Sequence, residues 1–233
     1  MKCVILQPSY IPWRGYFHQI YKADIFVFYD DVQYDKNGWR NRNQIKTSQG
    51  LQWLTIPVHT KGSVVEKIPI NRIEVSWERA WNESHWKAIQ FAYRKAPFFH
   101  KYEDFFSWVY AKQPQYLSDF TIETTIEISR MLGIHHTRFI TTSGLETVTG
   151  EKTDRLISIL KSVGADYYIS GPSAKDYIEM EKFNDAGIRL EYMNYNYPEY
   201  TQLYPPYSPN VSIIDLLFMM GENSLENIIR NDL

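Results

Sequence analysis

The sequence predicts an α/β domain built on a central, mainly parallel β-sheet, with a helical, aromatic-rich insertion. Residues 4–34 have the pattern of a strand, a turn, a helix and a second strand, and residues 137–192 alternate strand and helix again. Between these parts, residues 77–133 carry aromatic side chains near helical spacing. The 233 residues contain no internal repeat and no low-complexity linker, which favours a single domain over residues 1–233.

The first strand and helix are defined by the place where an apolar run stops. Residues 4–6 are apolar, the run ends at Gln7-Pro8, and a proline-broken aromatic turn with Gly15 leads into a short helix. A second strand covers residues 24–29 and ends in two carboxylates. In open α/β sheets, ligands bind beyond the carboxyl ends of the strands. The polar residues after both strands therefore predict a site at this edge of the sheet.

The middle of the chain is expected to hold short strands followed by helices. A turn is expected at residues 59–63, and Gly133 fits a helix C-cap. The expected strands are residues 51–58 and 68–75, with residues 38–47 as a loop or an edge strand. The expected helices are residues 77–93, 102–110 and 117–132.

The last hundred residues return to alternation of strand and helix. The expected strands are residues 137–141, 167–170 and 188–192. The expected helices are one capped by Thr149 and running to Val163, then residues 177–186, 213–220 with Ser212 as cap, and 224–230.

Composition narrows the class of protein. The formal net charge is −2 with no basic run, so the electrostatic footprint of a nucleic-acid-binding protein is missing. No window is apolar for long enough to insert into a membrane. Cys3 is alone, which excludes a disulfide within a monomer and a cysteine–zinc site, and we expect a cytoplasmic protein. The 18 Tyr, 12 Phe and 7 Trp suit a pocket for sugars or planar ligands, although composition alone favours an aromatic core.

Three segments are candidates for the site. The glycine of the turn at residues 8–16 would let a ligand approach the backbone near a helix N-terminus, which favours an anion; a structural turn is the equal alternative. Residues 39–46 pack three cations and three amides together, as a phosphate or carboxylate needs, although a solvated face is the commoner explanation.

The third segment is the pair Asp30-Asp31, which could bind a metal, act as a base, or hold a sugar or an amine. Adjacent side chains of an extended strand point to opposite faces, so we expect one carboxylate to be functional and the other to belong to a turn. His18 is a further candidate base. The histidines lack the spacing of a zinc helix, no serine lies in a nucleophile elbow, and no metal site is predicted.

Residues 150–153 do not form a phosphate loop, because Glu151 splits the glycine–lysine pair and the earlier glycine is missing. Lys152 and Arg155 can still reach an anion. Asp215 follows Ser212 early in a helix, so we expect it to cap that helix.

Along almost its full length, the chain resembles the WbqC-like family. The matching motifs are QPSYIPWRGYF from Gln7, DDVQY from Asp30, WRNRNQIK from Trp39, GEKTDRL from Gly150, YISG from Tyr168, YTQ from Tyr200 and SIIDLLF from Ser212. The family is tied to bacterial O-antigen and related surface-polysaccharide gene clusters. The resemblance therefore implies a pathway more firmly than a reaction.

A weaker resemblance covers about thirty N-terminal residues. The first strand and its turn are similar to the opening of the nucleotidylyltransferase superfamily, in which a His-x-Gly-His signature grips the phosphates of ATP. Trp13 and Tyr16 stand where those histidines would be. The stretch from Asp30 to Tyr34 is similar to one in pantothenate synthetase, which joins an acid to an amine through an acyl-adenylate. The resemblance implies a nucleotidylyltransferase-like, Rossmann-like sheet and makes ATP a candidate cofactor.

Taken together, these features predict acyl or aminoacyl transfer to an amino sugar carried as a nucleotide sugar. Nucleotidyl transfer and non-catalytic binding of a sugar nucleotide are the alternatives. The candidate catalytic residues are Asp30, Asp31 and His18. The candidate substrate-binding residues are Gln7, Trp13, Gly15, Tyr16, Gln33, Tyr34, Arg40, Arg42, Asn43, Lys46, Lys152, Arg155, Ser170, Gly171, Tyr177, Tyr200 and Gln202.

Overall fold

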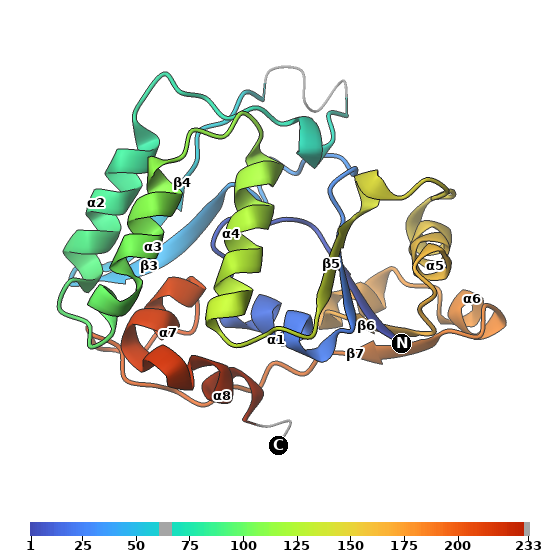
Figure 1. Ribbon diagram of the computed structural model, residues 1–233. Helices are drawn as coiled ribbons and strands as arrows, with labels where there is room; N and C mark the ends of the chain where they lie inside the picture. The colour runs from blue at the N-terminus through green and yellow to red at the C-terminus, as the bar shows by residue number, and fades with distance from the viewer. Residues whose placement is uncertain (61–66, 231–233) are drawn as a thin grey trace.

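A computed structural model describes residues 1–60 and 67–230, and its centre is a five-stranded parallel sheet (Figure 1). The strand order is β5-β2-β1-β6-β7. The strands are β1 (Lys2–Leu6), β2 (Ile25–Phe28), β5 (Arg138–Thr141), β6 (Tyr167–Ser170) and β7 (Arg189–Tyr192). The predicted α/β class with a central parallel sheet is thus confirmed.

Helices cover both faces of this sheet. The bounds of the helices are α1 (Arg14–Lys22), α2 (Trp81–Tyr93), α3 (Phe99–Ala111), α4 (Leu117–Met131), α5 (Lys152–Ser162), α6 (Met180–Asp185), α7 (Ile213–Met220) and α8 (Ser224–Ile229). In Figure 1, α5 and α6 lie on one side of the sheet, and α1, α4 and α7 lie on the other. The result is a three-layer α/β/α arrangement.

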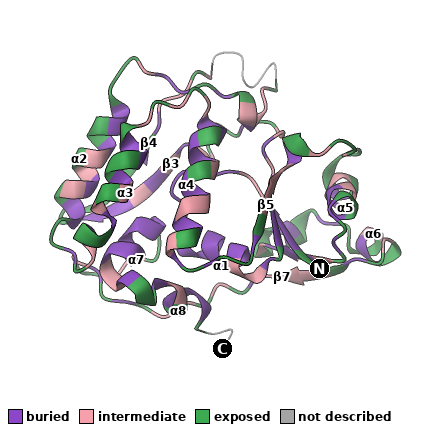
Figure 2. Ribbon diagram, viewed as in Figure 1, coloured by how far each residue is buried: buried purple, intermediate pink, exposed green. Residues whose placement is uncertain are grey.

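Two cores follow from the alternation of side chains along each strand. Val4 and Phe26 point into one core, whereas Cys3, Ile5 and Val27 point into the other, which α5 and α6 close. Because both faces are covered, the inner strand β2 is apolar throughout and fully buried, as is typical of parallel sheets, whereas the edge strands β5 and β7 carry charged residues. Figure 2 shows buried residues concentrated in the sheet, α1 and α7.

The order of the strands fixes where a ligand can bind. The chain runs from β1 to β2 and on to β5 in one direction, and then returns to place β6 and β7 on the other side of β1. Val4 of β1 therefore pairs with Phe26 on one side and with Ile169 on the other. This is a Rossmann-like order, and its topological switch point lies between β1 and β6.

A large insertion separates β2 from β5. It contains an antiparallel hairpin of β3 (Arg42–Thr47) and β4 (Gly50–Thr55), followed by α2, α3 and α4. Aromatic side chains such as Phe106 and Phe120 fill the space between these helices and belong to the same core as Phe26. We propose that the insertion, expected at residues 77–133, folds with the sheet as one domain, because this core is continuous.

Three expected elements differ in the structure. Residues 68–75 form the short 3₁₀ helix η1 (Ile70–Arg72) with isolated bridges instead of a strand, because Pro69 has no N–H for a ladder. Thr149 does not cap α5, since Gly150 adopts a φ of +81° and the helix begins only at Lys152. The helix expected at 177–186 is shorter, and η3 (Pro172–Asp176) precedes it. Part of the turn expected at 59–63 lies outside the described residues.

Two expected helix ends are confirmed. Ser212 caps α7, because its side chain accepts a hydrogen bond from the Ile214 N–H at 3.3 Å. Gly133 ends α4 with a φ of +84°, which a side chain would strain. Over residues 1–60 and 67–230, the structure contains no helix with the length and apolar character to cross a membrane.

Candidate functional site

A cavity of about 530 Å³ opens at the switch point of the sheet. Leu6 ends β1 at this cavity and Ser170 ends β6, while Trp13 and Tyr16 contribute from the start of α1. We call it the switch-point pocket. Its volume lies within the range typical of small-molecule sites, roughly 300–1,000 Å³.

The lining of the switch-point pocket is aromatic and polar. Its residues are Ile5, Leu6, Ser9, Pro12, Trp13, Tyr16, Gln19, Trp39, Arg40, Asn43, Tyr168, Ser170, Gly171, Ser173, Ala174, Tyr177, Pro209, Asn210 and Val211. Arg40 is the one charged residue among them. Of the predicted binding residues, this pocket brings together Trp13, Tyr16, Arg40, Asn43, Ser170, Gly171 and Tyr177.

Arg40 keeps hydrogen-bonding capacity in the pocket. Its Nη1 donates to the Gln7 carbonyl at 3.1 Å, but its buried Nε has no partner. Among the described residues, no carboxylate forms an ion pair with this guanidinium. Burial lowers the pKa of Arg40, while nearby Tyr16 and Asp35 oppose that shift. A half-buried cation with an unused donor and no carboxylate partner favours an anionic ligand.

The turn after β1 is ordered by Gln7, Trp13 and Tyr16. The Tyr16 hydroxyl donates to the same Gln7 carbonyl at 3.1 Å, and burial raises the pKa of Tyr16. Gln7 thus takes part through its backbone. A Cβ on Gly15 would stand 2.3 Å from the Trp13 ring. The glycine therefore leaves room for the indole, which favours the structural turn over the close approach of a ligand that the sequence also suggested.

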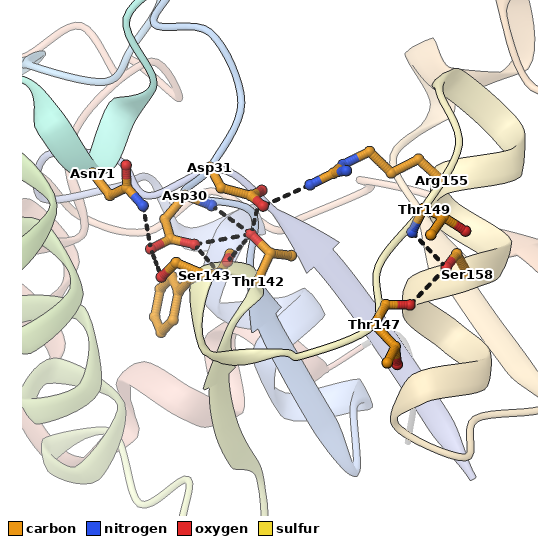
Figure 3. A network of polar contacts seen from close by, with 10 residues as sticks. Asp30, Asp31, Asn71, Thr142, Ser143, Thr147, Thr149, Arg155 and Ser158 are labelled. Carbon is orange, nitrogen blue, oxygen red and sulfur yellow. Dashed lines mark hydrogen bonds and ion pairs between the residues drawn. The ribbon is translucent and has the colours of Figure 1, made fainter.

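The two predicted carboxylates form a network beside this pocket, shown in Figure 3. Asp30 is buried, and it accepts hydrogen bonds from the Ser143 N–H at 2.9 Å and the Ser143 hydroxyl at 2.5 Å. The hydroxyl of Thr142 lies 2.9 Å from one Asp30 oxygen and 2.7 Å from one Asp31 oxygen. Both carboxylates therefore meet at Thr142.

This convergence corrects the expectation that the two side chains point apart. That expectation assumed an extended strand, but β2 ends at Phe28 and the chain turns before Asp30. Asp31 forms an ion pair with Arg155 at 2.6 Å, and this guanidinium lies 5.7 Å from the Tyr29 ring centre. Neither carboxylate lines the switch-point pocket.

The other predicted residues of the first half lie outside the pocket lining. His18 is buried in α1, and its Nδ1 lies 2.9 Å from the Tyr197 hydroxyl. Gln33 is exposed and forms an isolated antiparallel β-bridge with Pro69. Tyr34 is buried, and its pKa is raised to about 12, chiefly by burial.

Arg42 and Lys46 have partners of their own in the hairpin. Arg42 donates to the Asn37 carbonyl at 2.6 Å and lies 5.0 Å from the Trp53 ring centre. Lys46 is buried and donates to the Pro206 carbonyl. Because side chains alternate along β3, Asn43 points inward to the pocket, whereas Arg42 does not line it.

Tyr200 and Gln202 belong to a separate buried cluster. Asp215 accepts hydrogen bonds there from the hydroxyls of Tyr93 at 2.9 Å and Tyr200 at 2.7 Å, and from Gln202 at 3.0 Å. Burial raises the pKa of Asp215, and these donors oppose the rise. The expected capping by Asp215 is wrong, since its side chain turns to this cluster. Lys152 is exposed at the start of α5, away from the pocket lining.

The sequence did not single out several lining residues. Trp39 stands beside Arg40 at the start of the WRNRNQIK motif, but it is not among the predicted binding residues. Residues 209–211 contain no motif that points to a site. They lie at the pocket because the next residue, Ser212, donates its N–H to the Gln44 carbonyl at 2.8 Å, a contact between distant parts of the chain. Within the described part of the chain, no group of three or more His, Cys, Asp or Glu residues could hold a metal ion.

Comparison with known proteins places the chain in a family. The profile of the WbqC-like protein family matches residues 7–227. A protein of Mycobacterium tuberculosis (strain ATCC 25618 / H37Rv), called "Uncharacterized protein Rv1507c", is 41% identical over 222 residues, which cover 94% of each chain. No solved structure matches. The motifs that form the switch-point pocket and the Asp30 network fall within the matched range, and the chain belongs to the WbqC-like protein family.

Proposed function

We propose that the protein binds a nucleotide sugar in the switch-point pocket and transfers an acyl or aminoacyl group to its amino sugar. The pathway would be the biosynthesis of O-antigen lipopolysaccharide or a related bacterial surface polysaccharide. The observation that carries the proposal is Arg40, a half-buried cation with an unused donor in an aromatic pocket at the switch point.

Three properties of the pocket support a nucleotide sugar. The exposed ring of Tyr177 offers a face for a planar base. Arg40 and the nearby N-terminus of α1, whose first turn carries no acidic residue, favour a phosphate group. Amide and hydroxyl side chains such as Asn43 and Ser170 suit the hydroxyls of a sugar.

Amide formation also needs a base. The sugar amine would attack the carbonyl carbon of an activated acyl donor, the bond to the leaving group would break with its electron pair, and the amine proton would pass to the base. Asp30, Asp31 and His18 remain the candidates. Asp31 is the least enclosed of the three, because its side chain is 27% exposed and pairs with Arg155, whereas Asp30 and His18 are each 3% exposed.

The lining fits ATP chemistry of the nucleotidylyltransferase type poorly. The pocket contains no histidine, and indole and phenol rings stand at Trp13 and Tyr16 in place of the signature histidines. Nucleotidyl transfer through ATP therefore has weaker support from this pocket than acyl transfer to a bound nucleotide sugar.

One observation favours a non-catalytic alternative. Asp30 already accepts hydrogen bonds from Ser143, and the His18 ring already lies against the Tyr197 hydroxyl. If Asp31 likewise stays with Arg155, the protein would bind the sugar nucleotide for a neighbouring enzyme.

Mass spectrometry of a reaction mixture separates these possibilities. The purified protein is incubated with an amino-sugar nucleotide and an acyl-thioester or amino-acid donor, with and without ATP. We expect an acylated sugar nucleotide, strongly reduced product with Asp31→Asn, and unchanged product with Asp104→Asn, a carboxylate exposed on α3. Tight binding without turnover would favour the non-catalytic alternative. The absence of both binding and turnover would contradict the proposal.

A further inference from the structure

We propose that two neighbouring tryptophans with mutually tilted rings, Trp39 and Trp53, form a second subsite that binds the sugar ring of the ligand. We call this pair the tryptophan platform. The inference rests on the proposed function, because it assigns the sugar end of the ligand that the switch-point pocket holds.

The tryptophan platform is exposed to solvent. Trp39 is 47% exposed and Trp53 is 45% exposed, and their ring centres lie 5.1 Å apart with an angle of 35° between the planes. Leu51 stands two residues before Trp53 on the same face of β4 and is also exposed. Contiguous exposed apolar side chains rimmed by polar residues mark binding surfaces.

The platform is continuous with the switch-point pocket. Trp39 lines the pocket and is the neighbour of Arg40 in the chain. On the other side, Gln44 connects Trp53 to the pocket wall. In the amide orientation that satisfies both of its polar atoms, Gln44 accepts from the Trp53 indole N–H at 3.1 Å and donates to the Asn210 carbonyl at 3.2 Å.

The platform is also held in place before any ligand arrives. The guanidinium of Arg42 lies 5.0 Å from the Trp53 ring centre, and it also donates to the Asn37 carbonyl at 2.6 Å. Since Asn37 precedes Trp39 by two residues, Arg42 links the segment that carries one tryptophan to the ring of the other. A subsite with fixed rings loses little conformational entropy on binding.

A sugar ring fits these surroundings better than a wholly apolar group. One face of a pyranose presents C–H groups that pack on an aromatic ring, while its hydroxyls need polar partners at the edge. Gln44 and Asn210 supply such a polar edge beside the rings. With the diphosphate at Arg40, the adjacent Trp39 is the first surface that the attached sugar would reach.

Two-dimensional NMR of the ¹⁵N-labelled protein tests the platform directly through its indole N–H signals. The probes are UDP-N-acetylglucosamine, UDP and free N-acetylglucosamine. The signals of Trp39 and Trp53 are identified with Trp39→Ala and Trp53→Ala, and Trp108→Ala is the matched control, since Trp108 is 48% exposed on α3. We expect the nucleotide sugar and the free sugar to shift the Trp39 and Trp53 signals and to leave the Trp108 signal unmoved.

Affinities give the second readout. Loss of one aromatic contact predicts that Trp53→Ala weakens binding of UDP-N-acetylglucosamine by about fivefold or more, and that of UDP by less than about twofold. Equal weakening for both probes, or unshifted platform signals with both sugars, would overturn the platform. If the wild-type protein is a dimer, Trp53→Ala is a monomer and no sugar shifts the platform signals, the platform is overturned and the two tryptophans instead contact a second copy of the chain.

The three probes distinguish failure of the platform from failure of the proposed function. If the platform signals respond to free N-acetylglucosamine while no nucleotide binds, the platform stands and the nucleotide-sugar proposal fails. If UDP binds and depends on Arg40 while no sugar shifts the platform signals, the pocket stands and the platform fails.

Discussion

The substitution Gly15→Ala sets two physical effects of opposite sign against each other. In a helix, alanine is favoured over glycine by up to about 1 kcal/mol. In this helix, however, the new Cβ would stand 2.3 Å from Cζ2 and 2.5 Å from Cη2 of Trp13. Carbon atoms in contact are about 3.5–4.0 Å apart, so the indole must move by more than about 1 Å.

We expect the steric effect to win. Overpacking of this kind costs about 1–3 kcal/mol. The Trp13 ring is restrained, because it packs edge-on against the rings of Tyr195 and Tyr197, whose centres lie 4.9 Å and 6.0 Å from its own. Gly15→Ala should therefore lower the free energy of unfolding by about 1–2 kcal/mol net.

A double-mutant cycle isolates the cause. Urea unfolding is followed by far-UV circular dichroism for Gly15→Ala, Trp13→Ala and the double variant. Without the indole, the alanine meets no obstacle and should be neutral or stabilising, which gives a coupling energy of about 1–3 kcal/mol between the two sites. If Gly15→Ala stabilises the wild-type protein as much as it stabilises the Trp13→Ala variant, the reasoning about this turn is refuted.

Two further predictions concern buried polar groups. Burial lowers the pKa of His85 from 6.5 to about 4, so the unfolded chain binds a proton that the folded protein excludes within this window. The free energy of unfolding should fall by up to about 3 kcal/mol as the pH falls from about 6.5 to 4. Urea titrations of His85→Gln should lack this component. The same dependence of unfolding free energy on pH in the wild-type protein and His85→Gln would contradict the prediction. Asp215→Asn replaces one of the two acceptor oxygens by an N–H₂ donor, which then faces the hydroxyl of either Tyr93 or Tyr200, and it should lower the unfolding free energy by about 1–3 kcal/mol. An unchanged urea midpoint for Asp215→Asn would show that this cluster contributes little.

The sequence predicted the fold well where local pattern decides the outcome. Alternation of strand and helix at both ends of the chain gave the parallel sheet, and Ser212 and Gly133 marked helix ends through their own local chemistry. It also predicted the edge of the sheet at which polar residues gather, because the carboxyl ends of parallel strands lie together.

The sequence could not predict which side chains share a cavity. Arg40 and Arg42 are two residues apart in one motif, yet only Arg40 lines the pocket, and Arg42 contacts Trp53 instead. Asp215 likewise met partners from α2 and from residues 200–202, and contacts over such separations leave no local pattern. For the pair Asp30-Asp31, the pleat rule failed because the strand ends at Phe28, one residue earlier than assumed, and the two carboxylates lie beyond it.

Isothermal titration of Arg40→Ala tests most directly whether the switch-point pocket binds an anionic sugar nucleotide. UDP-N-acetylglucosamine and a panel of related nucleotide sugars are titrated into the wild-type protein, Arg40→Ala and the control Arg94→Ala, which removes an exposed cation at the end of α2. Charge-assisted hydrogen bonds contribute about 1.5–3 kcal/mol each, so we expect Arg40→Ala to raise the Kd by about tenfold or more and Arg94→Ala to leave it unchanged. A nucleotide sugar that binds Arg40→Ala and the wild-type protein equally well would contradict the assignment of this pocket.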